Sequence, residues 1–235
     1  LLLMELSVII PCFDEESTIR EIINRVKSSL TSLNITHEII VIDDKSNDKT
    51  KNILETELSS SVDKIIINTK NFGKGYSVKQ GVKYAKGRFT IIQDADLEYD
   101  PKDYNKILKP LQNEVADVVY GSRFIGSNEK RVLYFWHSIG NKLLTTLSNM
   151  FSDLNLTDME VGYKAFKTDV LKNIKLKENR FGFEPEITAK IAKMKVRIYE
   201  VGISYYGRSY EEGKKITWKD GLSAIKCIIQ YNLFK

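Results

Sequence analysis

Short apolar runs alternate with segments of helical periodicity through the first half of the chain. Apolar residues recur every three or four positions from Ile19 to Leu30 and again from Val78 to Ala85, which predicts two helices with one buried face each. Short apolar runs between and around them predict strands at 6–10, 38–42, 65–67, 89–93 and 118–120. Strands that alternate with helices indicate an α/β fold with a mostly parallel, doubly wound sheet and helices on both faces.

The second half of the chain is less regular. We expect helices near 139–150 and 186–194, strands near 163–166 and 196–201, and an amphipathic last helix from about Trp218 to Phe234. Asp100 and Pro101 predict the capped start of a helix. Gly87 is expected to stop the helix that Gly73–Gly75 opens.

Composition narrows the classes of function. The chain has 235 residues, of which 42% are hydrophobic, so it can bury a core and is not a disordered protein. No repeat or linker divides it, so we expect a single domain over 1–235, with halves of about 6–125 and 126–235. The net charge is +5, and Lys and Arg crowd the stretch 164–195, which fits an anionic partner or a solvated basic face. The absence of an aromatic and basic recognition module argues against nucleic acid.

The cysteines and the start of the chain bear on the compartment. Cys12 and Cys227 are the only cysteines, and neither belongs to a metal-spaced pair, which favours a reducing environment. Residues 1–4 are too short for a signal peptide, and no run of about 18 apolar residues is present to span a bilayer. We therefore expect a cytoplasmic protein, either free or peripheral on the cytoplasmic face of a membrane.

The segment 90–98 (TIIQDADLE) carries the most specific chemistry in the chain. An apolar run ends in Asp94 and Asp96, with Glu98 two positions later, and an extended chain would send all three side chains to the same side. Hard oxygen ligands at this spacing suit Mg²⁺ or Mn²⁺, especially where a diphosphate supplies further oxygens. A solvated turn after a buried strand is the plainer alternative.

Polar clusters follow four predicted strands at the point where each strand ends. They are 11–15 (PCFDE), 43–46 (DDKS), 94–96 (DAD) and 121–123 (GSR). Ligands of open parallel sheets bind beyond the carboxyl ends of the strands, so these clusters are expected to form a single site.

The motifs 7–15 (SVIIPCFDE), 41–46 (VIDDKS) and 94–96 resemble those of the family-2 glycosyltransferases, which have the GT-A fold. Within that family the chain most resembles the dolichyl-phosphate or polyprenyl-phosphate sugar synthases, which are mannosyl- or glucosyltransferases. Further matches lie at 121–124, 158–162 and 207–215, so the resemblance covers nearly the whole chain. The motifs are specific for the family but do not identify the sugar or the acceptor.

The resemblance implies a set of residues around the nucleotide sugar. Phe13 would stack near the base, Glu15 would bind donors of the ribose or base, and the backbone at Ile42 would contact the same groups. The alternative for Phe13 and Glu15 is a core residue and a first-turn helix charge. The whole implied set is Pro11, Phe13, Glu15, Ile42, Asp44, Lys74, Asp94, Ala95, Asp96, Arg123, Arg208 and Lys214.

The resemblance also implies a divalent cation that bridges the donor diphosphate. Asp94, Asp96 and Glu98 would be its ligands, although the family often has Gln where Glu98 stands. Bound Mg²⁺ or Mn²⁺ would stabilise the charge that develops on the departing nucleoside diphosphate. Gly73-Lys74-Gly75 lacks the spacing of a phosphate loop, so Lys74 is either a secondary nucleotide contact or part of a glycine turn.

Basic residues are implied at the diphosphate and the acceptor. Arg208, Lys214 and Lys215 lie in a polar segment that would close over the diphosphate and exclude water, or would simply be a basic surface loop. His137, Arg123 and Lys215 are the implied acceptor-binding residues, with a packed histidine as the alternative for His137. Asp96, Arg123 and Asp158 complete the implied catalytic set.

The expected reaction is transfer of a hexose, with inversion, from GDP-mannose or UDP-glucose to a polyprenyl or dolichyl phosphate. A phosphate acceptor is ionised near neutral pH and needs no general base. A sugar or protein hydroxyl acceptor would need one, and Asp158 and Glu160 are then the candidates. The last helix either covers the core or lies on a membrane surface near the lipid, and a separate membrane-spanning partner remains compatible.

Two other classes of protein share some of these features. A nucleotidyltransferase would carry a glycine- and arginine-rich loop after the first strand, where this chain has 11–15 (PCFDE). A non-catalytic sugar-nucleotide-binding protein would keep the nucleotide residues and lose the acceptor side. Retention of the Asp pair with Arg208 and Lys214 argues against it.

Overall fold

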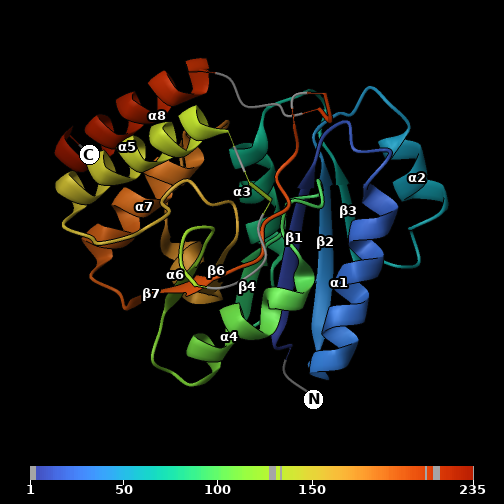
Figure 1. The fold of residues 1–235 in the computed structure, drawn as a ribbon. Coiled ribbons are helices and arrows are strands. Elements are labelled where there is room, and N and C mark those ends of the chain that lie inside the picture. The colour runs from blue at the N-terminus through green and yellow to red at the C-terminus, as the bar shows by residue number, and fades with distance from the viewer. Residues whose placement is uncertain (1–3, 127–130, 133, 210, 214–217, 235) are drawn as a thin grey trace.

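A mixed sheet lies at the centre of the molecule, with helices packed on both of its faces (Figure 1). The computed structural model describes residues 4–126, 131–132, 134–209, 211–213 and 218–234. Within these residues the sheet has seven strands in the order β3-β2-β1-β4-β6-β5-β7. The strands are β1 (Leu6–Cys12), β2 (His37–Asp43), β3 (Lys64–Ile67), β4 (Phe89–Ile92), β5 (Val118–Ser122), β6 (Lys164–Lys167) and β7 (Ile198–Gly202). The predicted α/β class is confirmed.

Strand direction determines which loops meet at one edge of the sheet. β1 pairs in parallel with β2 and β4, and β5 pairs in parallel with β7. β6 runs antiparallel to both of its neighbours, β4 and β5. The carboxyl ends of β1, β2, β4 and β5 therefore share an edge with the amino end of β6. The chain reverses its strand order between β1 and β4, which is where open α/β sheets bind ligands.

Both faces of the central strands are buried, which explains their uninterrupted apolar runs. Val8 and Ile10 of β1 belong to the main core with Ile22 of the first helix, whereas Ile9 packs with Ile42 on the opposite face. The helices are α1 (Ile19–Leu33), α2 (Thr50–Thr56), α3 (Lys74–Tyr84), α4 (Tyr104–Gln112), α5 (Phe135–Ser152), α6 (Thr168–Asn173), α7 (Phe183–Met194) and α8 (Trp218–Ile229).

The second half of the chain forms a group of helices beside the sheet. α5, α7 and α8 contact one another, and α5 and α8 run side by side at the upper left of Figure 1. The predicted last helix ends at Ile229 as an α-helix and continues as a wider π-type turn over Gln230–Phe234. None of the helices in the described ranges combines the length and apolar character needed to cross a bilayer.

Two local predictions have different outcomes. The Asp100 side chain accepts a hydrogen bond from Lys102 N at 3.0 Å with Pro101 in the first turn, so the predicted cap is confirmed. The prediction for Gly87 is wrong, because α3 ends at Tyr84 and Ala85 is its capping residue. Gly87 is needed for a close approach instead, since a Cβ there would lie 2.5 Å from Ser7 N.

Candidate active site

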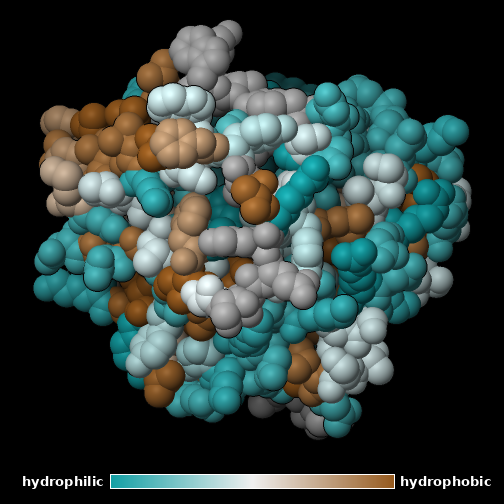
Figure 2. Space-filling model, in the orientation of Figure 1, coloured by the Kyte–Doolittle hydropathy of each residue, from teal (hydrophilic) through white to brown (hydrophobic). Residues whose placement is uncertain are grey.

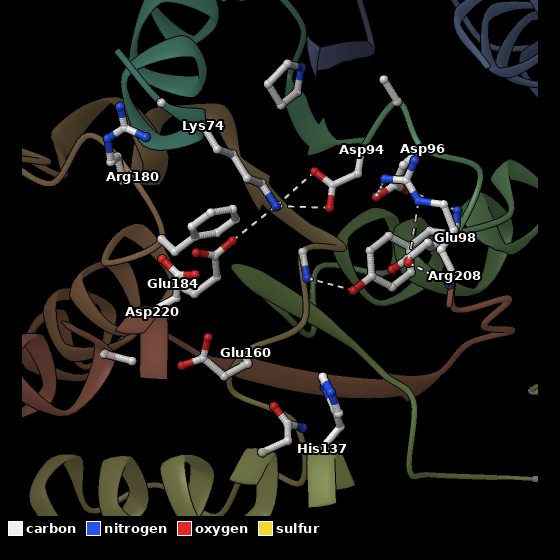
Figure 3. Close-up of a pocket in the computed structure, with 18 of the residues that line it drawn as sticks. Lys74, Asp94, Asp96, Glu98, His137, Glu160, Arg180, Glu184, Arg208 and Asp220 are labelled. Carbon is white, nitrogen blue, oxygen red and sulfur yellow. Dashed lines mark hydrogen bonds and ion pairs between the residues drawn. The ribbon is translucent and has the colours of Figure 1, made fainter. Parts of the chain in front are cut away.

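A cavity of about 810 Å³ opens at the sheet edge where β1, β2, β4 and β5 end (Figure 3). Residues from all four predicted strand-end clusters line it, and α3, α5, α7 and α8 complete its wall. The predicted site residues on the wall are Pro11, Phe13, Glu15, Asp44, Lys74, Asp94, Ala95, Asp96, Glu98, Arg123, His137 and Arg208. The single site expected from strand direction therefore exists as a continuous cavity.

Two buried carboxylates order the backbone on the side of the cavity near β1 and β2. Asp44 accepts hydrogen bonds from Gly73 N at 2.6 Å and Phe72 N at 3.1 Å, so it holds the loop that leads into α3. Glu15 accepts a hydrogen bond from Thr18 Oγ1 at 2.7 Å. These contacts fix both carboxylates in place at the cavity wall.

Ile42, a further predicted nucleotide contact, is a core residue with its side chain fully buried. Its carbonyl oxygen accepts a hydrogen bond from Cys12 Sγ at 3.6 Å. The residue does not line the cavity, and its side chain packs with Ile9 and Ala85 in the core.

The acidic segment is a turn, so the condition of an extended chain, under which the three side chains would share one side, is not met. β4 ends at Ile92, Leu97 has a φ of 64°, and Asp96 Oδ1 accepts a hydrogen bond from Glu98 N at 3.1 Å. The three carboxylates consequently have different neighbours rather than one shared face. Asp94 faces α3, whereas Asp96 and Glu98 face the segment after β7 (Figure 3).

Lys74 joins the acidic turn to α7. Its Nζ lies 2.8 Å from Asp94 Oδ1 and 3.1 Å from Glu184 Oε1. Burial alone would lower the pKa of Lys74, but Asp94 and Glu184 raise it above the usual lysine value, so the amine stays charged. From the sequence, Lys74 was predicted to be either a secondary nucleotide contact or part of a glycine turn. In the structure its amine pairs with two carboxylates on the cavity wall.

Arg208 bridges the nucleotide side and the acidic turn. Its guanidinium lies 3.2 Å from Asp96 Oδ2 and 3.3 Å from Glu15 Oε1, and its backbone N donates to Glu98 Oε1 at 2.8 Å. Burial works against the charge on Arg208, but Asp96 and Glu15 raise its pKa. This guanidinium supplies the positive charge that a bound cation would otherwise bring to Asp96.

The acidic turn has the chemistry of a divalent cation site. No three His, Cys, Asp or Glu side chains among the residues described converge as a complete metal site. Burial, followed by repulsion from Asp94 and Glu98, raises the pKa of Asp96 to about 7. A cation would relieve this crowding of carboxylates, and the donor diphosphate would supply the remaining hard oxygens. The residues therefore fit Mg²⁺ or Mn²⁺.

Arg123 and Asp158 form a buried, bidentate ion pair at the cavity wall. Arg123 Nε and Nη2 each donate to an Asp158 carboxylate oxygen at 2.6 Å, and Asn141 Nδ2 donates to Oδ1 at 3.1 Å. Asp158 is fully buried and does not line the cavity, whereas Arg123 does. The geometry gives Asp158 the role of orienting Arg123.

The structure describes some of the residues that are expected to bind the acceptor. His137 lines the cavity near the start of α5, with its ring 5.7 Å from that of Tyr134. Lys214 and Lys215 lie outside the described residues.

Several residues on the cavity wall were absent from the predicted set. They are Tyr99, Glu160, Arg180, Glu184, Tyr205 and Asp220, of which Glu160 had been considered only as a base. Tyr205 donates to Glu98 Oε2 at 2.8 Å, and Tyr99 accepts from Gly162 N at 3.1 Å. Tyr99 follows the acidic turn and Glu160 lies shortly before β6, whereas the other four residues come from later in the chain, so no local motif marks them as part of the site.

Replacing Gly162 with alanine is expected to weaken nucleotide binding about tenfold and to lower the free energy of unfolding by about 1–3 kcal/mol, because overpacking a buried site forces its neighbours to move. An added Cβ would overlap Asp94 Oδ2 and lie 2.9 Å from Lys74 Nζ, so the ion pair must shift. Calorimetric titration of a nucleoside diphosphate with Mn²⁺ and thermal unfolding would measure both effects. Gly140→Ala adds the same methyl group where no atom lies within 4 Å and serves as the control for stability. Unchanged nucleotide affinity in Gly162→Ala would contradict the expectation.

Comparison with known proteins agrees with this geometry. The family model "Glycosyl transferase family 2" matches residues 7–175. The chain is 30% identical over 220 residues to a dolichol-phosphate mannosyltransferase of Pyrococcus furiosus, covering 91% of this chain and 61% of that protein. It is 27% identical over 216 residues to a dodecaprenyl-phosphate galacturonate synthase of Rhizobium johnstonii, covering 90% and 62%. The chain thus spans about three fifths of the length of these two relatives.

Solved structures support the fold. Glucosyl-3-phosphoglycerate synthase of Mycobacterium tuberculosis, in complex with Mn²⁺ and UDP, aligns with a TM-score of 0.74 over 97% of this chain and 80% of that one. At 17% sequence identity the likeness concerns the fold alone. The strand order, the family match and this likeness together confirm the GT-A fold. The chain belongs to glycosyl transferase family 2.

Proposed function

We propose that this chain transfers a hexose from a nucleotide sugar to a polyprenyl or dolichyl phosphate, with inversion at the anomeric carbon. As a family 2 glycosyltransferase the chain is an enzyme, which removes the nucleotidyltransferase and the non-catalytic binding protein from consideration. The observation that carries the proposal is the arrangement of one cavity, with an acidic turn at Asp94–Glu98 and cationic side chains at Lys74, Arg123 and Arg208. Two relatives are named for lipid-phosphate acceptors.

The acidic turn would hold the cation and the donor diphosphate. Asp94, Asp96 and Glu98 are the proposed ligands, and a bound Mg²⁺ or Mn²⁺ supplies Lewis-acid stabilisation of the leaving diphosphate. Arg208 contacts Asp96 and Glu15 across this position, so it would turn toward the diphosphate when the donor binds. Phe13, Glu15 and Asp44 line the cavity beyond β1 and β2, where we propose that the nucleoside lies.

A phosphate acceptor would approach from the side of α5. It carries a negative charge near neutral pH, because the second pKa of a phosphate monoester is about 6. Its oxygen can therefore attack without a general base, provided that it is oriented. Arg123, fixed by Asp158, and His137 on α5 are the groups on the wall that could orient it.

The surface formed by α5 and α8, on the side from which the acceptor would approach, is apolar and supports a membrane location. Figure 2 shows a hydrophobic area over α5 and α8, at the upper left. Exposed side chains there include Trp136 at 77%, Leu143 at 61% and Leu222 at 58%. Apolar side chains on adjacent helices favour burial in a bilayer interface, where a polyprenyl chain would also lie. We propose that the enzyme works at the cytoplasmic face of a membrane, alone or with a membrane-spanning partner.

The assay that tests this function uses polyprenyl phosphate in liposomes, Mn²⁺, and GDP-mannose or UDP-glucose. We expect release of the nucleoside diphosphate and a glycosylated lipid phosphate, and loss of both products when EDTA removes the cation. A thermal-shift comparison of GDP with UDP, each with Mn²⁺, selects the donor first. Hydrolysis without lipid product, or equal turnover in EDTA, would contradict the proposal.

A hydroxyl acceptor is the second candidate, and Glu160 is the observation that favours it. Glu160 lines the cavity, and burial followed by repulsion from Glu184 raises its pKa to about 8, within the range useful for a general base. Asp158, the other candidate base, has both oxygens engaged by Arg123. Substitution of Glu160 would then lower kcat and leave donor affinity unchanged.

A further inference from the structure

The three carboxylates proposed to bind the cation are all in contact with hydrogen-bond donors of the protein itself. Both oxygens of Asp94 face Lys74 Nζ, at 2.8 and 3.0 Å. Asp96 Oδ1 accepts a hydrogen bond from Glu98 N at 3.1 Å, and Asp96 Oδ2 lies 3.2 Å from Arg208 Nη2. Glu98 accepts one hydrogen bond from the backbone N of Arg208 and one from a tyrosine hydroxyl, each at 2.8 Å. In this arrangement each carboxylate oxygen of the acidic turn already has a partner within 3.2 Å.

The Arg208 guanidinium holds its carboxylates less closely than Lys74 holds Asp94. Its Nη2 lies 3.2 Å from Asp96 and 3.3 Å from Glu15, whereas hydrogen bonds between charged groups usually measure about 2.7–2.9 Å (Figure 3). Its Nε is buried, lies 3.8 Å from Glu98 and has no hydrogen-bond partner among the described residues. The guanidinium thus retains an N–H group that a further anion could accept.

A free cation could reach Asp96 Oδ2 only if Arg208 moved away. The Arg208 side chain is 18% exposed, so moving it away from its carboxylates would leave a largely buried charge without compensation. A diphosphate removes this cost, because its oxygens offer the guanidinium a new anionic partner. The cation can then take the carboxylates while Arg208 takes the phosphate, and no charge is left unpaired.

We propose that Arg208 excludes a free divalent cation from the acidic turn and gives up its place only when a diphosphate arrives. The cation and the nucleotide then bind together, and the protein without nucleotide keeps Arg208 as its own counter-ion at Asp96. This inference rests on the proposed function, since it takes the acidic turn to be the site of the cation.

The test measures Mn²⁺ binding without any nucleotide, from the paramagnetic resonance signal of the free ion. Arg208→Gln should bind Mn²⁺ at least about tenfold more tightly than the wild type, because the competing guanidinium is gone. The same variant should bind GDP and UDP, at saturating Mn²⁺, about tenfold more weakly, because the diphosphate loses its arginine. A general loosening of the site would weaken both ligands, so the opposite signs distinguish exclusion from a structural role.

Arg25→Gln is the matched control, because it also removes one arginine charge from an ion pair, here an exposed one with Glu21 at 2.6 Å. It should change neither affinity. If Arg208→Gln is less stable than the wild type, Mn²⁺ alone should still raise its Tm and leave that of the wild type unchanged.

Equal Mn²⁺ affinity in the wild type and Arg208→Gln, or unchanged nucleotide affinity in the variant, would overturn the inference and leave the glycosyltransferase function intact. Failure of the wild type to bind GDP or UDP with Mn²⁺ would overturn both.

Discussion

Replacing Asp96 with asparagine is expected to reduce turnover by on the order of 10²–10³-fold. Asp96 lies between Asp94 and Glu98 in the acidic turn, and it is the proposed cation ligand that also contacts Arg208. Asparagine keeps the shape but removes the charge, so the site would hold the cation, and through it the diphosphate, less tightly. Turnover of the nucleotide sugar and calorimetric titration of the nucleoside diphosphate with Mn²⁺ would measure the loss.

The pH dependence of binding provides a second readout for the same residue. The pKa of Asp96 is raised to about 7, first by burial and then by Asp94 and Glu98. A proton then competes with the cation below pH 7, so cation-dependent nucleotide binding should weaken as the pH falls through this value. In Asp96→Asn this pH dependence should disappear. Asp169→Asn, on the exposed start of α6, should keep both turnover and the wild-type pH profile. Wild-type cation affinity in Asp96→Asn would contradict the assignment of the metal site.

Replacing Asp158 with asparagine is expected to lower the free energy of unfolding by about 3–5 kcal/mol. The substitution leaves the Arg123 guanidinium, 14% exposed, without the carboxylate that pairs with it. Burial alone opposes the charge on Arg123, and Asp158 is the main group that raises its pKa in compensation. Thermal unfolding should show Tm lower by roughly 10 °C.

An exposed ion pair with the same distance between nitrogen and oxygen provides the matched control for Asp158. Arg131 and Glu212 also lie 2.6 Å apart, but their side chains are 50% and 48% exposed. Glu212→Gln is expected to change the free energy of unfolding by less than about 1 kcal/mol, because solvent screens an exposed pair. Equal destabilisation by the two substitutions would show that burial of the Arg123–Asp158 pair is not what stabilises it.

The elements predicted from the sequence agree best with the structure where burial is local and periodic. The helix from Ile19 is confirmed because its apolar spacing reports one buried face, and the strand 38–42 is confirmed within β2. The predicted ends differ from the structure by a few residues. The strand 6–10 continues to Cys12, because Pro11 keeps its place in the pairing with β2.

The predicted site is nearly complete for the residues that follow parallel strands. Glu15, Asp44, Asp96 and Arg123 all reach the cavity wall, as strand direction required. Asp158 does not, because its two oxygens are turned toward Arg123. Apolar periodicity does not reveal which buried carboxylate pairs with which cation.

The sequence by itself determined the fold class, the family and the four strand-end clusters that form one site. These follow from apolar periodicity and from motifs of adjacent residues, which are local properties of a chain. Only the tertiary structure decided that β6 runs antiparallel, that Lys74 links Asp94 to Glu184, and that Glu160 faces the cavity with an unsatisfied oxygen. The physical reason is that these contacts join residues far apart in the chain, and their geometry depends on strand pairing and helix packing that no local pattern encodes.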